Sequence, residues 1–251
     1  MESRKVACSS HQNQPCVFIT GISGKLGEVL CKRLCDQGFK CKGLVRDEDA
    51  KKEVQGLGCT DVFVGDLTKL QTDDFVKYLE GCDFVIDAAG STSGKDIEKI
   101  EFTSGKFLAQ AAMKSNVKKY ISMSAVGCDH FSSGERKDAL VCDKCKENRE
   151  YAENQYKLDQ FIQNETKNLD YLIVRSGDLT EEKAMNKILI GRPHLSTKYR
   201  KMCHTSREDL ANLLVCLLKN DSLKNMTFEV INCKDEGMPI EEAVKHLNVA
   251  L

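Results

Sequence analysis

Short apolar runs alternate with segments of helical periodicity along most of the chain. Near the N-terminus, the apolar run at 16–20 is followed by Leu26, Leu30 and Leu34, which recur every four residues before Gly38. Apolar residues at this spacing share one face of a helix, and a glycine just beyond them is typical of a helix C-cap. The first two elements that we expect are therefore a strand and an amphipathic helix.

The same alternation continues towards the C-terminus. Strands are expected at 40–45, 61–66, 83–90, 120–124, 171–175 and 227–231, and helices at 71–79, 97–115, 150–164, 207–218 and 240–247. Near-continuously apolar strands that alternate with helices are typical of a parallel sheet covered on both faces. The pattern predicts an α/β fold with a doubly wound parallel sheet.

Length, charge and cysteine content narrow the class of protein. The 251 residues suit a single domain over 15–251, which follows a polar, flexible tail at 1–14. Because 37 Lys and Arg nearly balance 38 Asp and Glu, the charge supports neither a nucleic-acid nor a membrane partner. No apolar run approaches the ~18 residues of a membrane span. Thirteen cysteines, mostly within apolar runs, and no recognisable signal peptide favour the cytoplasm.

A turn with three glycines joins the first strand to the first helix. Gly21 permits the positive φ of a tight turn, Gly24 lets backbone N–H groups approach a pyrophosphate, and Gly27 lets the helix pack close to the strand. The free N–H donors and the dipole of a helix N-terminus also favour phosphate. An ordinary glycine turn is the alternative. The predicted dinucleotide site comprises Thr20, Gly21, Ser23, Gly24, Lys25, Leu26 and Gly27.

Residues after the later strands extend this predicted site, because ligands of such sheets bind beyond the carboxyl ends of the strands. Arg46 suits a 2′-phosphate and favours NADP(H) over NAD(H), although Asp47 could hold the 2′-hydroxyl of NAD if Arg46 is only a solvated charge. Asp66 and Leu67 are expected at the adenine end, with a helix N-cap as the equal alternative for Asp66. The predicted set is completed by three small residues, Ala88, Ala89 and Gly90, where the backbone is expected to approach the cofactor. A plain turn is the alternative for them.

Together these motifs resemble the atypical short-chain dehydrogenases/reductases, specifically the NmrA-like and plant-type NAD(P)-binding subgroup. The resemblance covers 17–231 and is carried by TGISGKLG at 20–27, LVRD at 44–47, GDLT at 65–68, DAAGS at 87–91, LDYLIVRSGDLT at 169–180 and SREDLA at 206–211. It implies a Rossmann-type fold and an NAD(P)(H) cofactor, usually NADP(H). It implies no particular substrate, and the expected substrate-side segment at about 176–205 carries no motif that identifies one.

The catalytic pattern of that family is a Ser after the fifth strand and a Tyr four residues before a Lys on the following helix. By resemblance, Ser124 and Lys157 take the Ser and Lys positions, and Lys157 would also bind the nicotinamide ribose. Glu153 stands where the Tyr is expected, and Tyr151 and Tyr156 are expected to lie off the required helix face. A satisfied strand-end hydroxyl and a solvated helix charge are the alternatives for Ser124 and Lys157.

A CxxC pair, Cys142 and Cys145, follows Cys128 and His130 in the loop after the fifth strand. Structural zinc, a redox-responsive thiol pair and loop cysteines without a role all remain open. No metal ligand is predicted among the site residues.

The preferred functional hypothesis is a cytoplasmic NADP(H)-dependent oxidoreductase. It would transfer a hydride to or from a small carbonyl or quinone-like substrate, with the proton supplied by Ser124 or water because the Tyr is missing. The second hypothesis is a non-catalytic NADP(H)-binding redox sensor that acts on a protein partner. The sequence leaves the substrate and any homo-oligomer open.

Overall fold

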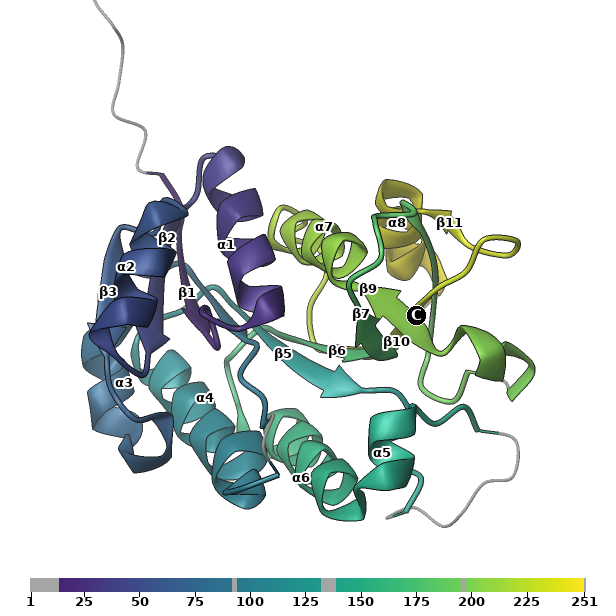
Figure 1. The fold of residues 1–251 in the computed structure, drawn as a ribbon, viewed down its shortest axis with the longest axis horizontal. Helices are drawn as coiled ribbons and strands as arrows, with labels where there is room; N and C mark the ends of the chain where they lie inside the picture. Colours follow the sequence, from purple (N-terminus) through teal and green to yellow (C-terminus); the bar gives the residue numbers. More distant parts are fainter. Residues whose placement is uncertain (1–13, 92–93, 132–138, 196, 251) are drawn as a thin grey trace, which may run out of the picture.

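A mostly parallel nine-stranded sheet lies between two layers of helices in the computed structural model (Figure 1). The structure describes residues 14–91, 94–131, 139–195 and 197–250. Almost all of the predicted N-terminal tail lies outside these residues. The predicted α/β fold is confirmed as a single Rossmann-like domain, with its strands at the places that the apolar runs indicated.

The sheet has the strand order β11-β8-β10-β6-β5-β4-β1-β2-β3. All neighbours from β10 to β3 pair in parallel, whereas β8 pairs antiparallel with both β10 and β11. The order reverses between β1 and β4, which is where a doubly wound sheet leaves a crevice for a ligand. The strands are β1 (Cys16–Thr20), β2 (Lys40–Val45), β3 (Asp61–Val64), β4 (Phe84–Asp87), β5 (Lys119–Ala125), β6 (Tyr171–Ser176), β8 (Lys187–Gly191), β10 (Met226–Asn232) and β11 (Met238–Pro239).

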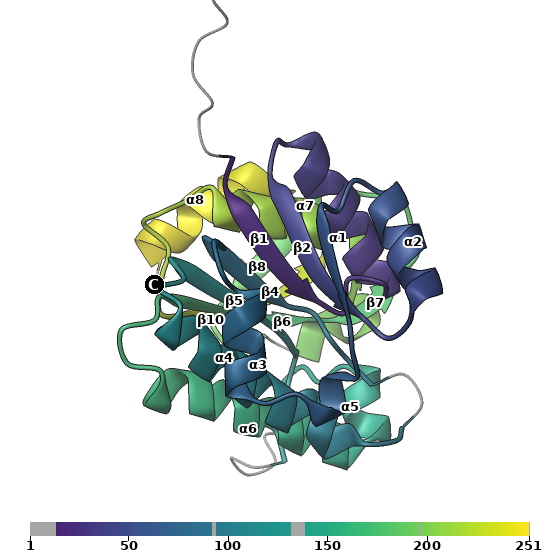
Figure 2. The same cartoon turned by 90° about the vertical axis from the view of Figure 1, so that its left-hand side faces the viewer.

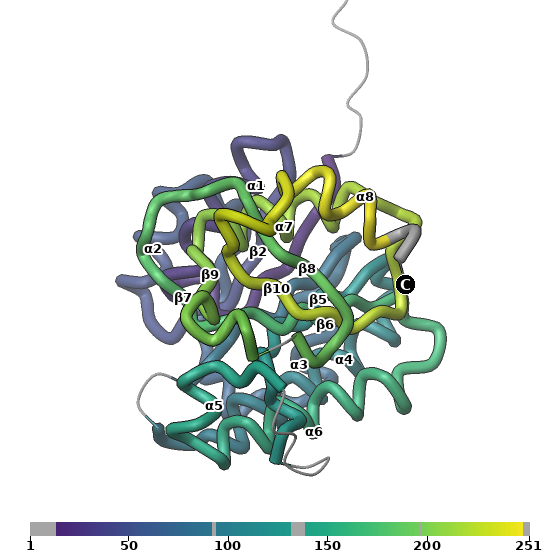
Figure 3. The backbone as a smooth tube through the Cα atoms, turned by 90° about the vertical axis from the view of Figure 1, so that its right-hand side faces the viewer, coloured from purple at the N-terminus to yellow at the C-terminus, as the bar shows by residue number. Residues whose placement is uncertain are grey.

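Helices cover both faces of the sheet (Figure 2). Packed together on one face are α1 (Lys25–Asp36), α7 (Arg207–Leu218) and α8 (Ile240–Ala250). On the other face are α3 (Thr72–Tyr78), α4 (Ser104–Lys114) and α6 (Arg149–Glu165), with the short α5 (Asp143–Glu147) against α6. Strands β8 and β10 and helix α8 lie together near one edge of the sheet (Figure 3). In the strand order, β3 forms the opposite edge.

The alternation of side chains along β1 explains the two layers. Val17 and Ile19 belong to the core formed with α1 and α7, whereas Phe18 belongs to the core formed with α3, α4 and α6. All three side chains are fully buried. Because successive residues of a strand point to opposite faces, a continuously apolar strand needs cover on both sides.

Several smaller elements were not expected from the sequence. They are α2 (Glu48–Gly56), α5, β8, β11, the 3-10 turns η1 (Leu67–Lys69) and η3 (Thr197–Met202), and a separate parallel pair, β7 (Asp178–Thr180) with β9 (His204–Ser206). The single helix predicted at 97–115 begins with a π-helical turn, η2 (Lys99–Thr103), which continues into α4. Within the described residues, no helix is long and apolar enough to cross a membrane.

Candidate cofactor and active site

A cavity of about 1110 Å³ runs along the carboxyl ends of the parallel strands, where the strand order reverses. Its walls come from the turn after β1, the ends of the next strands, η2, α5 and the first turns of α6. The cavity gathers most of the site residues that the sequence predicts. These are Gly21, Ser23, Gly24, Lys25, Leu26, Gly27, Arg46, Asp66, Leu67, Ala88, Ala89, Gly90 and Ser124.

The turn between β1 and α1 has a backbone path that requires glycine at two positions. Gly21 has φ +66°, and a Cβ on it would lie 2.6 Å from the Ala88 carbonyl oxygen. A Cβ on Gly27 would lie 2.2 Å from the Gly21 carbonyl oxygen. Gly24 has an ordinary extended backbone and is the N-cap of α1, with no side chain capping the helix. The first N–H groups of α1 are therefore left for a ligand in the cavity, as a pyrophosphate requires.

Thr20 is buried behind this turn and does not line the cavity. Its hydroxyl donates a hydrogen bond to Asp87 Oδ1 at 2.5 Å, and Tyr120 donates to Asp87 Oδ2 at 3.1 Å. Burial raises the pKa of the Asp87 carboxyl, although these hydrogen bonds oppose the rise. The structure therefore gives Thr20 the role of joining β1 to β4 beneath the turn, not the predicted contact with a cofactor.

At the far end of the cavity, two acidic residues cap short helices. Asp47 is the N-cap of α2, and its Oδ1 accepts from the Ala50 N–H at 2.9 Å. Asp66 is the N-cap of η1, and its Oδ1 accepts from the Thr68 N–H at 3.0 Å. Hydrogen bonds from Thr68 lower the pKa of Asp66. The N-cap interpretation of Asp66 is confirmed, while Arg46 is exposed on the cavity wall beside Asp47.

Helix α6 presents a different face to the cavity from the one predicted. Lys157 is exposed, does not line the cavity, and its Nζ lies 3.5 Å from Asn154 Oδ1. Glu153 pairs with Arg149 at 2.7 Å, also away from the cavity lining. Lys157 is therefore not positioned to bind the ribose of a molecule in the cavity, at variance with the prediction from the resemblance.

The α6 residues that line the cavity are Tyr151 and Gln155. Tyr151 lies off the helix face that carries Lys157, as predicted, but the face of Tyr151 is the one that lines the cavity. The two residues have the spacing of four that puts side chains on one face of a helix, so Gln155 occupies the position of the Lys in the family's pattern. The spacing of Tyr151 and Gln155 is present in the sequence, but the resemblance implies a lysine at the second position and so pointed to Lys157.

Glu101 lies opposite these two residues, in the π-helical turn η2. Its Oε1 accepts from the Ser91 N–H at 2.6 Å, and its Oε2 accepts from Gln155 Nε2 at 2.5 Å. Burial raises the pKa of Glu101, while the Ser91 N–H and the charge of Lys144 oppose the rise. Gln155 Oε1 is buried without a hydrogen-bond partner among the described residues. The wall thus combines a buried carboxyl of raised pKa with an amide oxygen that has no partner among the described residues.

The ammonium group of Lys144, on α5, lies over the ring of Tyr151. Its Nζ lies 3.8 Å from the ring centroid and donates to the Ser91 carbonyl at 3.3 Å. Burial raises the pKa of the Tyr151 phenol well above its usual value, and the charge of Glu101 adds to the rise. Tyr151 is therefore a phenol that keeps its proton at neutral pH.

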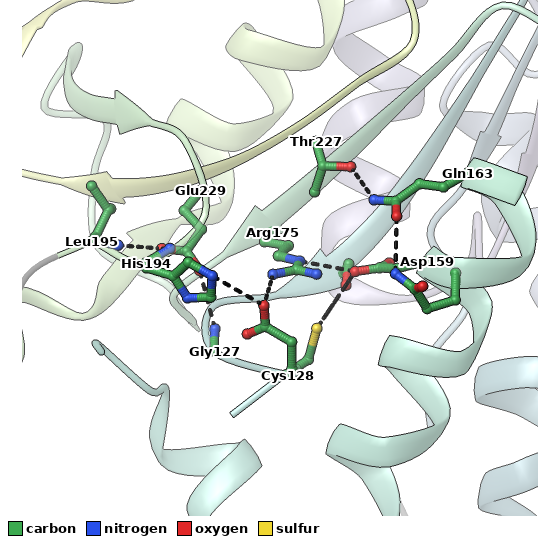
Figure 4. Close-up of polar contacts among 12 residues, drawn as sticks. Gly127, Cys128, Asp159, Gln163, Arg175, His194, Leu195, Thr227 and Glu229 are labelled. Atoms are coloured by element: carbon green, nitrogen blue, oxygen red, sulfur yellow. Dashed lines mark hydrogen bonds and ion pairs between the residues drawn. The ribbon is translucent and has the colours of Figure 1, made fainter. Parts of the chain in front are cut away.

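Ser124, near the end of β5, contacts a buried charge network. Figure 4 shows Asp159 and Arg175 of this network. The Ser124 hydroxyl donates to Asp159 Oδ2 at 3.1 Å, and Arg175 Nε donates to the same oxygen at 2.8 Å. Arg175 Nη1 also lies 3.1 Å from Asp129 Oδ2. Nearby, the Glu229 carboxylate accepts the backbone N–H groups of Gly127, His194 and Leu195. Ser124 is thus both a satisfied strand-end hydroxyl and a residue of the cavity wall.

The expected substrate-side segment at about 176–205 contributes to the cavity only at its start. Ser176, Gly177, Asp178 and Leu179 line the wall, and Glu181 pairs with Lys25 of the glycine turn. Asp178 also accepts the Asp143 N–H at 2.7 Å, which holds the start of α5 beside the cavity. The later part of the segment folds into β8, η3 and β9.

The structure does not bring the predicted CxxC group together as a metal site. Cys142 lines the cavity and accepts the Cys145 N–H at 3.4 Å, while the Cys128 thiol contacts Asp159. In the described part of the chain, these cysteines and His130 do not form a set of candidate ligands within 4.8 Å of one another. The zinc interpretation is therefore not supported, and the redox interpretation of Cys142 and Cys145 remains a prediction.

Known proteins resemble this chain in both sequence and fold. The NAD(P)H-binding family model matches residues 21–221. The oxidoreductase ylbE from Lactococcus lactis is 23% identical, with a TM-score of 0.74 over 92% of this chain and 96% of its own.

Two proteins of Arabidopsis thaliana are also similar to this chain in sequence. Cinnamoyl-CoA reductase 1 is 24% identical over 55% of this chain and 42% of its own length. An uncharacterised chloroplastic protein is 24% identical over 88% of this chain and 70% of its own length. The chain spans less than half the length of cinnamoyl-CoA reductase 1. Because the family model matches most of the chain, the chain belongs to the NAD(P)H-binding family, and it shares its fold with the Lactococcus lactis protein.

Proposed function

We propose that this chain is an NADP(H)-dependent reductase that holds its cofactor along the 1110 Å³ cavity. The observation that carries the proposal is the composition of that one cavity. A glycine turn with free helix N–H groups lines one part of it, and Ser124, Tyr151 and Glu101 line another. This pairs a pyrophosphate site with proton-donating groups at the carboxyl ends of the strands, where such folds carry out their chemistry.

The cofactor's phosphates have different partners in this proposal. The N–H groups of Lys25, Leu26 and Gly27 would bind the pyrophosphate, since the Gly24 N–H already donates to the Gly21 carbonyl at 2.9 Å. The Arg46 guanidinium would bind the 2′-phosphate of NADP(H). The Asp47 carboxylate already accepts the Ala50 N–H as a helix cap, which makes it a weaker candidate for the 2′-hydroxyl of NAD. Asp66 and Leu67 would border the adenine.

The nicotinamide of a bound cofactor would supply the hydride. The chain's own residues then have to position the acceptor and deliver a proton to its oxygen. Tyr151 is placed for this task because its phenol lines the cavity and carries a proton at neutral pH, although its raised pKa makes it a weaker acid than a free phenol. Ser124 lines the same wall, but its one O–H is donated to Asp159, so it would have to turn away from Asp159 to reach that oxygen. The unpartnered Gln155 Oε1 would accept from a ribose hydroxyl.

Consumption of NADPH by the purified chain with a panel of small carbonyls and quinones tests this proposal. We expect turnover that Tyr151→Phe lowers by about 10²- to 10⁴-fold, the usual contribution of a positioned proton donor. Tyr171→Phe, on β6 outside the cavity lining, is the matched control and should keep full activity. Equal turnover in the two variants would contradict the role of Tyr151.

One observation favours a second function, that of a cofactor-binding redox sensor. Position 155 carries a glutamine where the family's pattern has a lysine, so no ammonium one turn along α6 lowers the pKa of Tyr151. Tight NADPH binding without consumption across the whole panel would support the sensor and its protein partner. A cytoplasmic location belongs to either proposal and is tested by tagging the chain in cells, since the Arabidopsis relative just described is chloroplastic.

A further inference from the structure

Three cysteine thiols converge at the end of the sheet away from the cavity. Cys31 and Cys35 lie one turn apart on α1, and Cys41 lies on β2. Their sulfur atoms are all within 4.8 Å of one another, and they are the only such group of three or more potential ligands in the described residues. A fourth thiol, Cys59, contacts Cys31 and lies 3.1 Å from the Cys41 carbonyl oxygen.

The surroundings of this thiol cluster suit a bound cation. Cys31 and Cys41 are fully buried, whereas Cys35 is partly exposed and offers a path from solvent. Cys35 is in the last turn of α1, where the helix carbonyls favour positive charge. The cluster thus places three sulfur atoms together, two of them buried and one within reach of solvent.

We propose that Cys31, Cys35 and Cys41 bind one thiophilic closed-shell metal ion, Zn²⁺ or Cu⁺, with Cys59 available as a fourth ligand. Each ligating thiol loses its proton to solvent when its sulfur bonds to the metal, and no electron is transferred. Thiolates select these soft ions over Mg²⁺ or Ca²⁺. Because the ligands come from α1 and β2, the ion would tie that helix to the sheet.

The geometry needs only small adjustment to accept such an ion. With Zn–S bonds of about 2.3 Å, tetrahedral ligand sulfurs are roughly 3.8 Å apart, and those of the cluster are within 4.8 Å. The turn before β3 packs closely against the site, because a Cβ on Gly58 would lie 3.2 Å from Cys35 Sγ. Cys41 is the second residue of β2 whereas Arg46 follows the end of that strand, so the metal site is separate from the proposed cofactor site.

Anaerobic titration of the reduced full chain tests the proposal. Zn²⁺ and Cu⁺ are each added in competition with a chromogenic chelator, and Co²⁺ serves as a spectroscopic probe for thiolate ligands. We expect one ion per chain and thiolate-to-cobalt charge-transfer absorption. Cys31→Ser and Cys41→Ser should weaken binding by more than the roughly 10- to 100-fold that loss of an outer-shell partner costs. The Zn²⁺ and Cu⁺ titrations identify which ion the site prefers.

The matched control is Cys82→Ser. Cys82 and Cys16 form a buried thiol pair with sulfurs 3.7 Å apart on another part of the sheet, so this change also removes a buried thiol. Its metal binding should equal that of the unmodified chain. If circular dichroism shows that the buried variants do not fold, Cys35→Ser at its partly exposed position decides the matter. Absence of binding in the unmodified chain, or equal binding in Cys35→Ser, would overturn the proposal.

Discussion

Gln155 Nε2 donates a hydrogen bond to Glu101 Oε2 at 2.5 Å, which joins α6 to the π-helical turn η2 across the cavity wall. Short π-helical segments are frequent at functional sites because they redirect a side chain that a regular helix would point elsewhere. Here the turn carries a carboxyl that is 2% exposed yet lines the cavity. The contact also fixes the glutamine with its other polar atom, Oε1, unpartnered among the described residues.

Gln155→Ala should weaken NADPH binding by about 10-fold, because it removes one acceptor for a ribose hydroxyl and releases Glu101. Lys157→Ala, two residues further along α6 and outside the cavity lining, should leave binding unchanged. Isothermal titration of both variants measures the difference. If Lys157→Ala bound NADPH weakly and Gln155→Ala bound it normally, the ribose-binding role would belong to Lys157, as the resemblance implies.

Arg46→Ala should raise the Kd for NADP by about 10- to 100-fold, the worth of roughly 1.5–3 kcal/mol from hydrogen bonds to a charged group. Affinity for NAD should stay the same, since NAD has no 2′-phosphate. Lys52→Ala removes a charge from the exposed Lys52–Asp49 pair on α2 and is the control. Parallel titrations with NADP and NAD check the preference, and an unchanged ratio in Arg46→Ala would exclude this guanidinium as its source.

The buried pair of Arg175 and Asp159 is expected to matter for stability. Asp159→Ala leaves Arg175 buried with one charged partner fewer, which should lower the free energy of unfolding by about 3–5 kcal/mol. Asp36→Ala removes the exposed pair with Lys32 and should change it by less than about 1 kcal/mol. Urea denaturation compares the two. Similar small losses in both would mean that water reaches the Arg175 network.

Glu101 should make stability depend on pH in a predictable direction. Its pKa is raised by burial, so the folded state binds the proton more tightly than the unfolded state does. This contribution to stability is full below the usual glutamate pKa and is lost as the pH rises through the higher folded value. Glu101→Gln should therefore lose less stability than the unmodified chain as the pH rises above the usual glutamate pKa. Exposed Glu147→Gln should match the unmodified chain in the same urea series.

The fold was predictable because each central strand is an apolar run with buried residues on both faces, as in Cys16–Thr20. Smaller elements escaped prediction where burial is slight. Helix α2 buries only Val54, so its sequence has no apolar stripe to reveal it. Strand β8 was missed although it is apolar, because its antiparallel place at the edge depends on pairing with distant β10.

The cofactor turn was predictable for a local reason, since the backbone approach at Gly21 and Gly27 excludes every other residue. The active face of α6 was not, because adjacent helix positions differ by about 100° and only packing fixes the rotation. Tyr151, Leu158 and Ile162 are buried on one stripe, which leaves Lys157 outside. Gln155, four residues after Tyr151, is a polar residue on the same buried stripe, and this position indicates that it faces the cavity.

Binding of NADPH to Gly24→Asp tests the central claim, a pyrophosphate at the N-terminus of α1, most directly. Gly24 has φ −84° and lacks a side-chain cap, and a Cβ on it would lie 3.1 Å from the Gly21 carbonyl oxygen, which needs only a small shift. An aspartate can therefore act as N-cap, and the melting temperature should stay close to that of the unmodified chain. Its carboxylate would occupy and repel the phosphate position, and calorimetric titration should show affinity reduced by at least about 100-fold. Unchanged affinity in this folded variant would contradict the account.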